Sequence, residues 1–327
     1  MASDEFDEIA ELFLPLTRGA PEALGLLDDA AVIPSRPGFD LVVTKDAIVA
    51  GVHALPNESP GDLARKLLGV NLSDLAAKGA EPYGAFLAVS WPDHWTAGMR
   101  RGFAQVLGEH AARYNVKLFG GDTVRTSGPF QASLTMLGWT PQGEMIRRNG
   151  ARIGDSVLVS GTIGDGWLGL IAAKGEGAFP AQDRTWLADR YRVPQPRCGI
   201  EPLCRQICTS AADVSDGLLA DVGHIAKASK VCLRIDLEAI PLSLSATRWL
   251  SLEPNPRDAR VALATGGDDY EIVCTVPSRL SARLMDEARQ FGVSFHVIGE
   301  VTAGEGVLPC WKGAPTVVER QGWSHIQ

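Results

Sequence analysis

The chain has 327 residues, of which 45% are hydrophobic and 21% are charged, and its net charge is -8. This composition is typical of a folded globular protein, and the length favours two domains because single hydrophobic cores usually stop growing below this size. The negative charge argues against a nucleic-acid partner, which would need a concentrated excess of Lys and Arg. The acidic amino terminus and the shortness of the apolar runs argue against a signal peptide and a membrane span, so the sequence predicts a cytoplasmic protein.

Gly and Pro residues divide the chain into short strand-like runs that alternate with helical stretches, which predicts a mixed α/β fold. In the first half the predicted strands are 41–46, 116–119 and 131–139. A helix is expected between the first two of these strands. Ser59 suits its N-cap, Pro60 suits its first position, and Gly79 suits its end.

The second half follows a polar, Gly-rich passage and opens with a predicted strand, DSVLVS, that enters a glycine loop. A further helix is expected over the segment LLADVGHIAKAS. We place the domain boundary near Gly143, so that the predicted domains are 1–143 and 144–327.

Many aspartates stand beside apolar, small or Gly residues at the edges of the predicted elements. In chain order they are Asp28, Asp29, Asp46, Asp74, Asp122, Asp213, Asp216, Asp268 and Asp269. Such neighbours predict partial burial, which is costly for a carboxylate unless it is paired or bound to a cation. Few of these segments carry a nearby Lys or Arg, and Mg²⁺ prefers oxygen ligands shared with water and phosphates, so the pattern favours several Mg²⁺ ions. The plainer alternative for any one of them is a solvated surface residue or a helix cap.

Glycines supply a second signal, because they let backbone N–H groups approach an anion closely. They are Gly120, Gly121, Gly161, Gly164, Gly166, Gly266 and Gly267. Walker A, Rossmann and protein-kinase motifs are all missing from the sequence, so the common nucleotide-binding families are not supported.

A set of seven segments runs in order along nearly the whole chain: DDAAVI, TKDAIVAGVH, KLLGVNLSDLAAKGAEP, FGGDTVR, GARIGDSVLVSGTIGD, DVSDGL and GGDDYEIV. These segments, in this order, resemble those of the thiamine-monophosphate kinase family, which belongs to the aminoimidazole-ribonucleotide synthetase superfamily. The resemblance implies that family's fold, with two α/β domains that contain mixed sheets. It implies that the N-terminal domain binds ATP and Mg²⁺ and forms a homodimer through its sheet, and that the C-terminal domain completes the cleft for ATP and substrate. It also implies direct Mg²⁺-dependent transfer of the γ-phosphoryl group of ATP to thiamine monophosphate, which gives thiamine diphosphate and ADP.

The resemblance further implies roles for individual residues. The implied Mg²⁺ ligands are Asp29, Thr44, Asp46, Asp74, Asp122, Asp213 and Asp216. The implied ATP contacts are Gly121, Asp122, Arg148 and Ser215, and the implied contacts of thiamine monophosphate are His53, Asp268 and Trp323. The three residues on which we expect catalysis to depend are Asp122, Arg148 and Asp216.

On the residues alone, His53 could equally be an exposed loop residue, Arg148 a surface arginine and Trp323 a packing residue at the chain end. The chain also departs from the family pattern at Leu27, Lys45 and Asp268, where Gly, Thr and Glu are usual. Two other functions are alternatives for this sequence: another ATP-using enzyme of the superfamily, and a binding protein stabilised by Mg²⁺ or Ca²⁺. The second is disfavoured because the sequence has no DxDxDG calcium loop.

Overall fold

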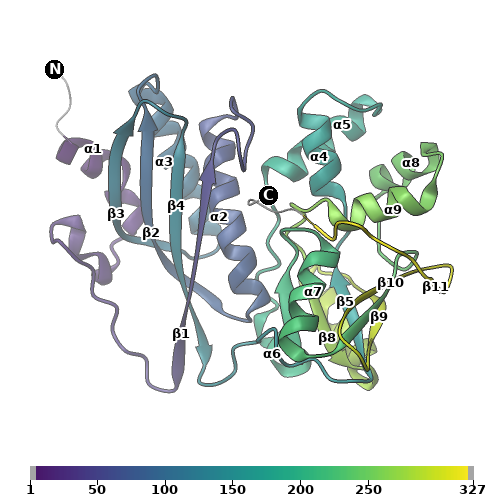
Figure 1. Ribbon diagram of the computed structural model, residues 1–327. Coiled ribbons are helices and arrows are strands. Elements are labelled where there is room, and N and C mark those ends of the chain that lie inside the picture. Colours follow the sequence, from purple (N-terminus) through teal and green to yellow (C-terminus); the bar gives the residue numbers. More distant parts are fainter. Residues whose placement is uncertain (1–4, 323–327) are drawn as a thin grey trace. The chain divides into compact units, whose positions relative to one another are not determined.

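A computed structural model describes residues 5–322. The chain forms two compact units (Figure 1). The first comprises the residues up to Leu75 together with Ala80–Gly143, and the second comprises Ala76–Gly79 together with the residues from Glu144 onward. Each unit contains a β-sheet and helices, which confirms the predicted α/β class. No helix within residues 5–322 is both long and apolar enough to cross a membrane.

The first unit is built on a four-stranded mixed sheet in the order β1-β4-β2-β3. Its elements are α1 (Glu5–Leu12), η1 (Leu14–Thr17), η2 (Pro21–Leu26), β1 (Phe39–Val49), α2 (Pro60–Ala77), β2 (Glu81–Pro92), α3 (Ala97–Arg113), β3 (Lys117–Thr126) and β4 (Gln131–Pro141), with the last two residues of α2 in the second unit. Strand β4 pairs antiparallel with both β1 and β2, whereas β2 pairs parallel with β3. Strand β3 therefore lies at one edge of the sheet, with β2 as its neighbour.

Helix α2 forms where its sequence signals place it. Ser59 Oγ accepts the N–H of Asp62 at 3.1 Å, and Gly79 follows the helix with φ +66°. Its apolar stripe is buried, with Leu63 at 2% and Leu67 at 0% exposure. Helix α3 also packs on the sheet of this unit, because the ring of Phe103 lies 5.5 Å from that of Trp91 on β2.

A polar contact joins the amino-terminal segment to this sheet. Tyr83 on β2 donates its hydroxyl to the carboxylate of Glu22 on η2, next to the rings of Phe119 and Trp139. Burial raises the pKa of Glu22, but the Tyr83 hydroxyl, the Glu22 backbone and the charge of Lys117 more than offset this, so the net pKa is lowered. Burial and Glu22 together raise the pKa of Tyr83 to about 12.

Replacing Tyr83 by Phe is expected to lower the free energy of unfolding by about 1–3 kcal/mol at neutral pH, because a buried carboxylate loses its donor. The folded-state pKa of Glu22 lies below its ordinary value of 4.5, so the stabilisation is complete above that pH and is lost as the pH falls through the lower folded value. Urea unfolding measures the free energies of unfolding of Tyr83→Phe and of the unmutated protein. The two values should therefore differ most at about pH 7 and much less in acid. A difference that grew in acid would contradict this assignment.

The second unit is built on a seven-stranded sheet in the order β11-β10-β7-β9-β5-β8-β6. Its elements are β5 (Asp155–Ser160), α4 (Asp165–Ala173), α5 (Ala181–Arg192), α6 (Glu201–Ile207), β6 (Ser210–Asp213), α7 (Leu218–Ser229), β7 (Cys232–Asp236), α8 (Leu244–Leu252), α9 (Pro256–Thr265), β8 (Ile272–Pro277), η3 (Ser278–Leu280), α10 (Ser281–Ala288), η4 (Arg289–Phe291), β9 (Phe295–Thr302), β10 (Gly306–Trp311) and β11 (Ala314–Pro315). Strands β7 and β10 pair parallel, and the other neighbouring strands pair antiparallel.

The two faces of this sheet carry separate cores, and β5 contributes to both. Val157 and Val159 belong to a buried cluster that includes Leu218 and Val222 of α7. Leu158, between them, belongs to a second cluster that includes Leu284 of α10. Because successive side chains of a strand point to opposite faces, a continuous apolar run is what a strand covered on both sides requires.

Candidate active site

Strand β1 and helix α2 bring together the oxygen-bearing side chains predicted from their segments. Thr44 and Asp46 lie two residues apart and therefore share one face of β1. Asn71 and Asp74 lie three residues apart on α2. Thr44 donates its hydroxyl to the carboxylate of Asp74, and the N–H of Asp46 donates to Asn71 Oδ1 at 3.1 Å. The side chains of Thr44, Asp46 and Asp74 are half-buried, so this group remains accessible to a small ligand.

Lys45 does not enter this group, although it stands between two of its members. It is exposed on the opposite face of β1, and its Nζ lies 3.5 Å from Thr135 Oγ1 on β4. The lysine that replaces the usual threonine at this position therefore lies on the face of β1 opposite Thr44 and Asp46.

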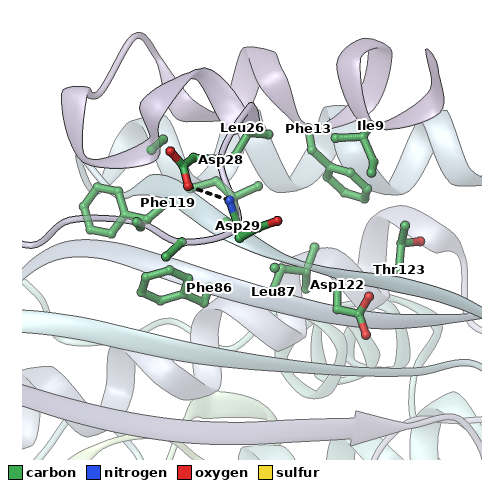
Figure 2. A pocket seen from close by; sticks show the side chains of 16 residues that line it. Ile9, Phe13, Leu26, Asp28, Asp29, Phe86, Leu87, Phe119, Asp122 and Thr123 are labelled. Carbon is green, nitrogen blue, oxygen red and sulfur yellow. Dashed lines mark hydrogen bonds between the residues drawn. The ribbon is translucent and has the colours of Figure 1, made fainter. Parts of the chain in front are cut away.

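Asp29 and Asp122 line a cavity of about 580 Å³ in the first unit (Figure 2). Ile9 of α1 and Phe13, which follows that helix, lie on one side of it, and Phe86 of β2 lies on the other. The cavity thus combines apolar walls with carboxylates, which is the usual character of a small-molecule site.

The expected partial burial is wrong for Asp28, Asp29 and Asp122, which are exposed. Asp28 and Asp29 lie in the loop between η2 and β1, where Asp28 Oδ1 accepts the N–H of Asp29 at 2.8 Å. Asp122 lies on the edge strand β3. Gly121 beside it is needed for strand packing, because a Cβ there would lie 1.9 Å from the backbone oxygen of Leu87.

His53 is half-buried in the turn after β1. Its Nδ1 accepts the N–H of Val49 at 3.1 Å, so the neutral ring carries its proton on Nε2. The ring is thereby oriented by the backbone.

In the second unit, Asp213 ends β6 and is buried, while Ser215 and Asp216 lie in the loop that leads into α7 and are half-buried. Asp221 in the first turn of α7 fixes this loop, because its Oδ2 accepts the N–H groups of Ser215 at 3.0 Å and Asp216 at 3.1 Å. One possible ligand atom from each of Asp216, Asp221 and His224 lies within 4.8 Å of the others. Asp221 therefore holds the loop in DVSDGL, and His224, three positions further along α7, lies close to Asp216 and Asp221.

Asp221 and His224 were missed as neighbours of the predicted site, although their spacing on α7 was a signal. Burial, and then the charge of Asp216, raise the pKa of Asp221 to about 7, while the two N–H groups and the charge of Arg148 oppose the rise. Burial and the charge of Arg148 lower the pKa of His224. Arg148 is exposed, and its backbone oxygen accepts the hydroxyl of Ser229 at 2.8 Å.

The loop Gly266–Glu271 lies against the same segment. The N–H of Asp268 donates to Ser215 O at 2.8 Å, and the N–H of Tyr270 donates to Val214 O at 2.8 Å. The Tyr270 hydroxyl donates to Asp268 Oδ1 at 3.0 Å. The structure thus brings the predicted residues Ser215 and Asp268 together, whereas Trp323 lies outside the described residues.

The glycine loop at the start of α4 corrects a prediction. Gly164 and Gly166 do turn their N–H groups toward an anion, but that anion is the chain's own Asp269, at 2.9–3.0 Å. Asp269 is buried, and burial raises its pKa while the two N–H groups oppose the rise. These N–H groups are therefore already used within the fold.

Comparison with known proteins identifies the family. The family models described as AIR synthase related protein, N-terminal domain and C-terminal domain, match residues 27–140 and 152–309. A thiamine-monophosphate kinase of Caulobacter vibrioides is 55% identical over 98% of this chain and 90% of the relative. The chain belongs to the thiamine-monophosphate kinase family. The resemblance inferred from the seven segments is thereby confirmed, as is the classification as an enzyme.

Solved structures of the thiamine-monophosphate kinase family share the fold over most of the chain. The enzyme from Stenotrophomonas maltophilia K279a is 34% identical with a TM-score of 0.83, over 97% of this chain and 98% of that one. A structure described as AaThiL complexed with AMPPCP and TMP is 28% identical with a TM-score of 0.77, over 90% of this chain and 89% of that one.

Proposed function

We propose that the chain transfers the γ-phosphoryl group of ATP directly to thiamine monophosphate, giving thiamine diphosphate and ADP. The observation that carries the proposal is 55% identity to a thiamine-monophosphate kinase along nearly the whole chain. A 28% identical structure that holds AMPPCP and TMP supports the same pair of substrates.

The oxygen donors fit the proposed Mg²⁺ ions. Thr44, Asp46 and Asp74 form one group of hard ligands, and the half-buried position of these side chains favours a cation between them. The further ligands that we propose are Asp29, Asp122, Asp213 and Asp216. When bound there, Mg²⁺ would neutralise phosphate charge that the acidic chain would otherwise repel.

Gly121 and Asp122 are the proposed ATP contacts in the first unit, and Arg148 and Ser215 are those in the second. Arg148 suits this role because its exposed guanidinium can bind a phosphate through two parallel N–H groups. Asp122, Arg148 and Asp216 are the residues on which we expect turnover to depend most.

For the acceptor we propose contacts with His53, Asp268 and Trp323. The Nε2–H of His53 can donate to a phosphate oxygen, and the half-buried carboxylate of Asp268 complements the positive thiazolium ring. The acceptor phosphate is already an oxyanion, so the chain needs no general base to activate it.

We also propose a cytoplasmic homodimer that pairs through the four-stranded sheet. Leu41 and Val43 are 38% and 56% exposed on the face of β1 opposite Thr44 and Asp46. Apolar side chains in such a row favour association with a second surface.

Purified protein incubated with ATP, Mg²⁺ and thiamine monophosphate is expected to produce ADP and thiamine diphosphate in equal amounts. Removing Mg²⁺ with EDTA should abolish both products, and adding back excess Mg²⁺ should restore them. Unphosphorylated thiamine serves as the matched control acceptor and should give no diphosphate. ATP turnover that persists unchanged in EDTA, or that needs a different acceptor, would overturn the proposal.

A further inference from the structure

The loop Gly266–Glu271 holds a backbone conformation that its residues disfavour. Gly267 has φ +79°, and the two non-glycine residues Asp268 and Tyr270 have φ +63° and +53°. A left-handed conformation costs about 1–2 kcal/mol for each non-glycine residue. Such a conformation persists only where the surrounding contacts enforce it.

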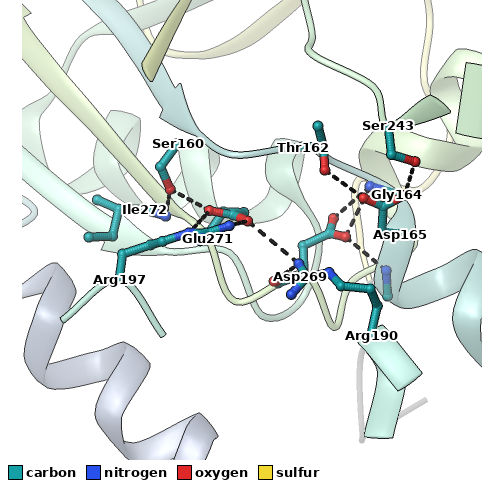
Figure 3. A network of polar contacts seen from close by, with 11 residues as sticks. Ser160, Thr162, Gly164, Asp165, Arg190, Arg197, Ser243, Asp269, Glu271 and Ile272 are labelled. Atoms are coloured by element: carbon teal, nitrogen blue, oxygen red, sulfur yellow. Dashed lines mark hydrogen bonds and ion pairs between the residues drawn. The ribbon is translucent and has the colours of Figure 1, made fainter. Parts of the chain in front are cut away.

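Asp269, between these two residues, directs its side chain to the start of α4 (Figure 3). Its carboxylate is 1% exposed and accepts the N–H of Gly164 at 2.9 and 3.0 Å and the N–H of Gly166 at 3.0 Å. Both glycines lie at the start of α4, where free N–H groups and the helix dipole favour an anion. The side chain of Asp269 therefore takes the place that a bound phosphate occupies at other helix amino termini.

The approach is close enough to exclude larger residues. A Cβ on Gly166 would lie 2.2 Å from the backbone oxygen of Asp268. The helix start thus contacts both the carboxylate of Asp269 and the backbone of the residue before it.

Glu271 fixes the other end of the loop. Its carboxylate is 0% exposed, accepts Ser160 Oγ and Arg197 Nε at 2.6 Å each, and pairs with Arg190 at 3.5 Å. Asp269 and Glu271 are thus anchored in the interior, and the half-buried Asp268 is held beside Ser215 by its N–H bond to Ser215 O.

We propose that Asp269 is a positioning residue that fixes Asp268 and Ser215 by binding the amino terminus of α4. The inference rests on the proposed function, in which Asp268 contacts thiamine monophosphate and Ser215 contacts ATP. Asp269 touches neither substrate. It acts by holding the strained loop in the conformation that presents these two residues.

Asp165 provides a matched control within the same cluster. It is 0% exposed, and its carboxylate accepts the hydroxyls of Thr162 at 2.5 Å and Ser243 at 2.6 Å. The Asp165 carboxylate thus accepts two side-chain hydroxyls, whereas the hydrogen bonds of the Asp269 carboxylate tie the loop to α4. Asp165→Asn and Asp269→Asn remove the same charge from the same interior, so a difference between them reports on the loop.

Asp269→Asn is expected to raise the KM for thiamine monophosphate about tenfold or more, because a misplaced Asp268 would lose its contact with the acceptor and a tenfold change corresponds to about 1.4 kcal/mol. Asp165→Asn should leave that KM within about twofold. Hydrogen exchange at the Asp268 and Tyr270 amides should become faster in Asp269→Asn and stay unchanged in Asp165→Asn. Equal KM values and equal exchange in the two variants would overturn the proposal, because loss of stability alone would explain them.

A second variant keeps the inference testable if Asp269→Asn does not fold. Gly166→Ala keeps the carboxylate but places a methyl group against Asp268 O, and it should raise the acceptor KM in the same direction. In the unmutated protein, the Gly164 and Gly166 amides should be among the slowest to exchange, and fast exchange there would overturn the proposal without any variant. The exchange measurements test the role of Asp269 without any turnover. A failure of the proposed kinase function would instead appear in the product assay, so the two failures can be distinguished.

Discussion

Asp74→Asn is expected to lower kcat for thiamine monophosphate by about a hundredfold or more, because a neutral amide is a poor ligand for Mg²⁺. Asp74 accepts the hydroxyl of Thr44 on β1, and Asn71, three residues before it on α2, accepts the N–H of Asp46. Its replacement removes a charge from a half-buried position without changing side-chain volume. The Mg²⁺ concentration that gives half-maximal rate should rise as well, and a Mg²⁺ titration of steady-state turnover measures both effects.

Asp62→Asn is the matched control for this variant, because it makes the same change on the same helix. Asp62 lies in the first turn of α2, where its N–H bonds Ser59 Oγ and its carboxylate pairs with Arg65 at 2.9 Å. This change should cost a few tenths of a kcal/mol of stability at most and leave kcat within about twofold. Near-normal turnover in Asp74→Asn, with unchanged Mg²⁺ dependence, would show that Asp74 is structural.

The sequence predicted the elements whose signals are local. Helix α2 carries its cap, its apolar stripe and its terminal glycine within one segment, and the structure has the helix at Pro60–Ala77. The segment LLADVGHIAKAS forms α7 at Leu218–Ser229, and DSVLVS forms β5. Periodicity and capping act over a few residues, so they can be read without the rest of the chain.

The site was predicted less completely, because its contacts join distant segments. Nothing near Gly164 indicates that its N–H is bound by Asp269, 105 positions away. The glycine spacing correctly indicated an anion, but an internal carboxylate and an external phosphate give the same local pattern.

Burial of individual aspartates also depended on the sheet order. Asp122 follows an apolar run and was expected to be partly buried, yet β3 is an edge strand and the side chain is exposed. Thr44 and Asp74 were expected to share a role, and their contact depends on how α2 packs on β1. Residue types predicted the chemistry of this group, whereas its geometry required the fold.

Arg148→Met is expected to lower kcat by about a hundredfold to a thousandfold, because the loss of a preorganised cation at a transferring phosphoryl group removes roughly 2.7–4 kcal/mol of transition-state stabilisation. The variant should unfold at the same temperature as the unmutated protein, since the Arg148 side chain is exposed and its backbone contact to Ser229 is retained.

Arg147→Met is the adjacent control, because Arg147 is also exposed and is held through its backbone oxygen by the N–H of Ala211 at 3.2 Å. The two variants remove the same charge from neighbouring positions, so general effects of net charge cancel between them. Arg148→Lys should retain part of the activity, because an ammonium group keeps the charge but cannot form two parallel hydrogen bonds to a phosphate. If Arg147→Met and Arg148→Met lowered kcat equally, the phosphate contact would be a diffuse electrostatic effect, and Arg148 would have no individual role in transfer.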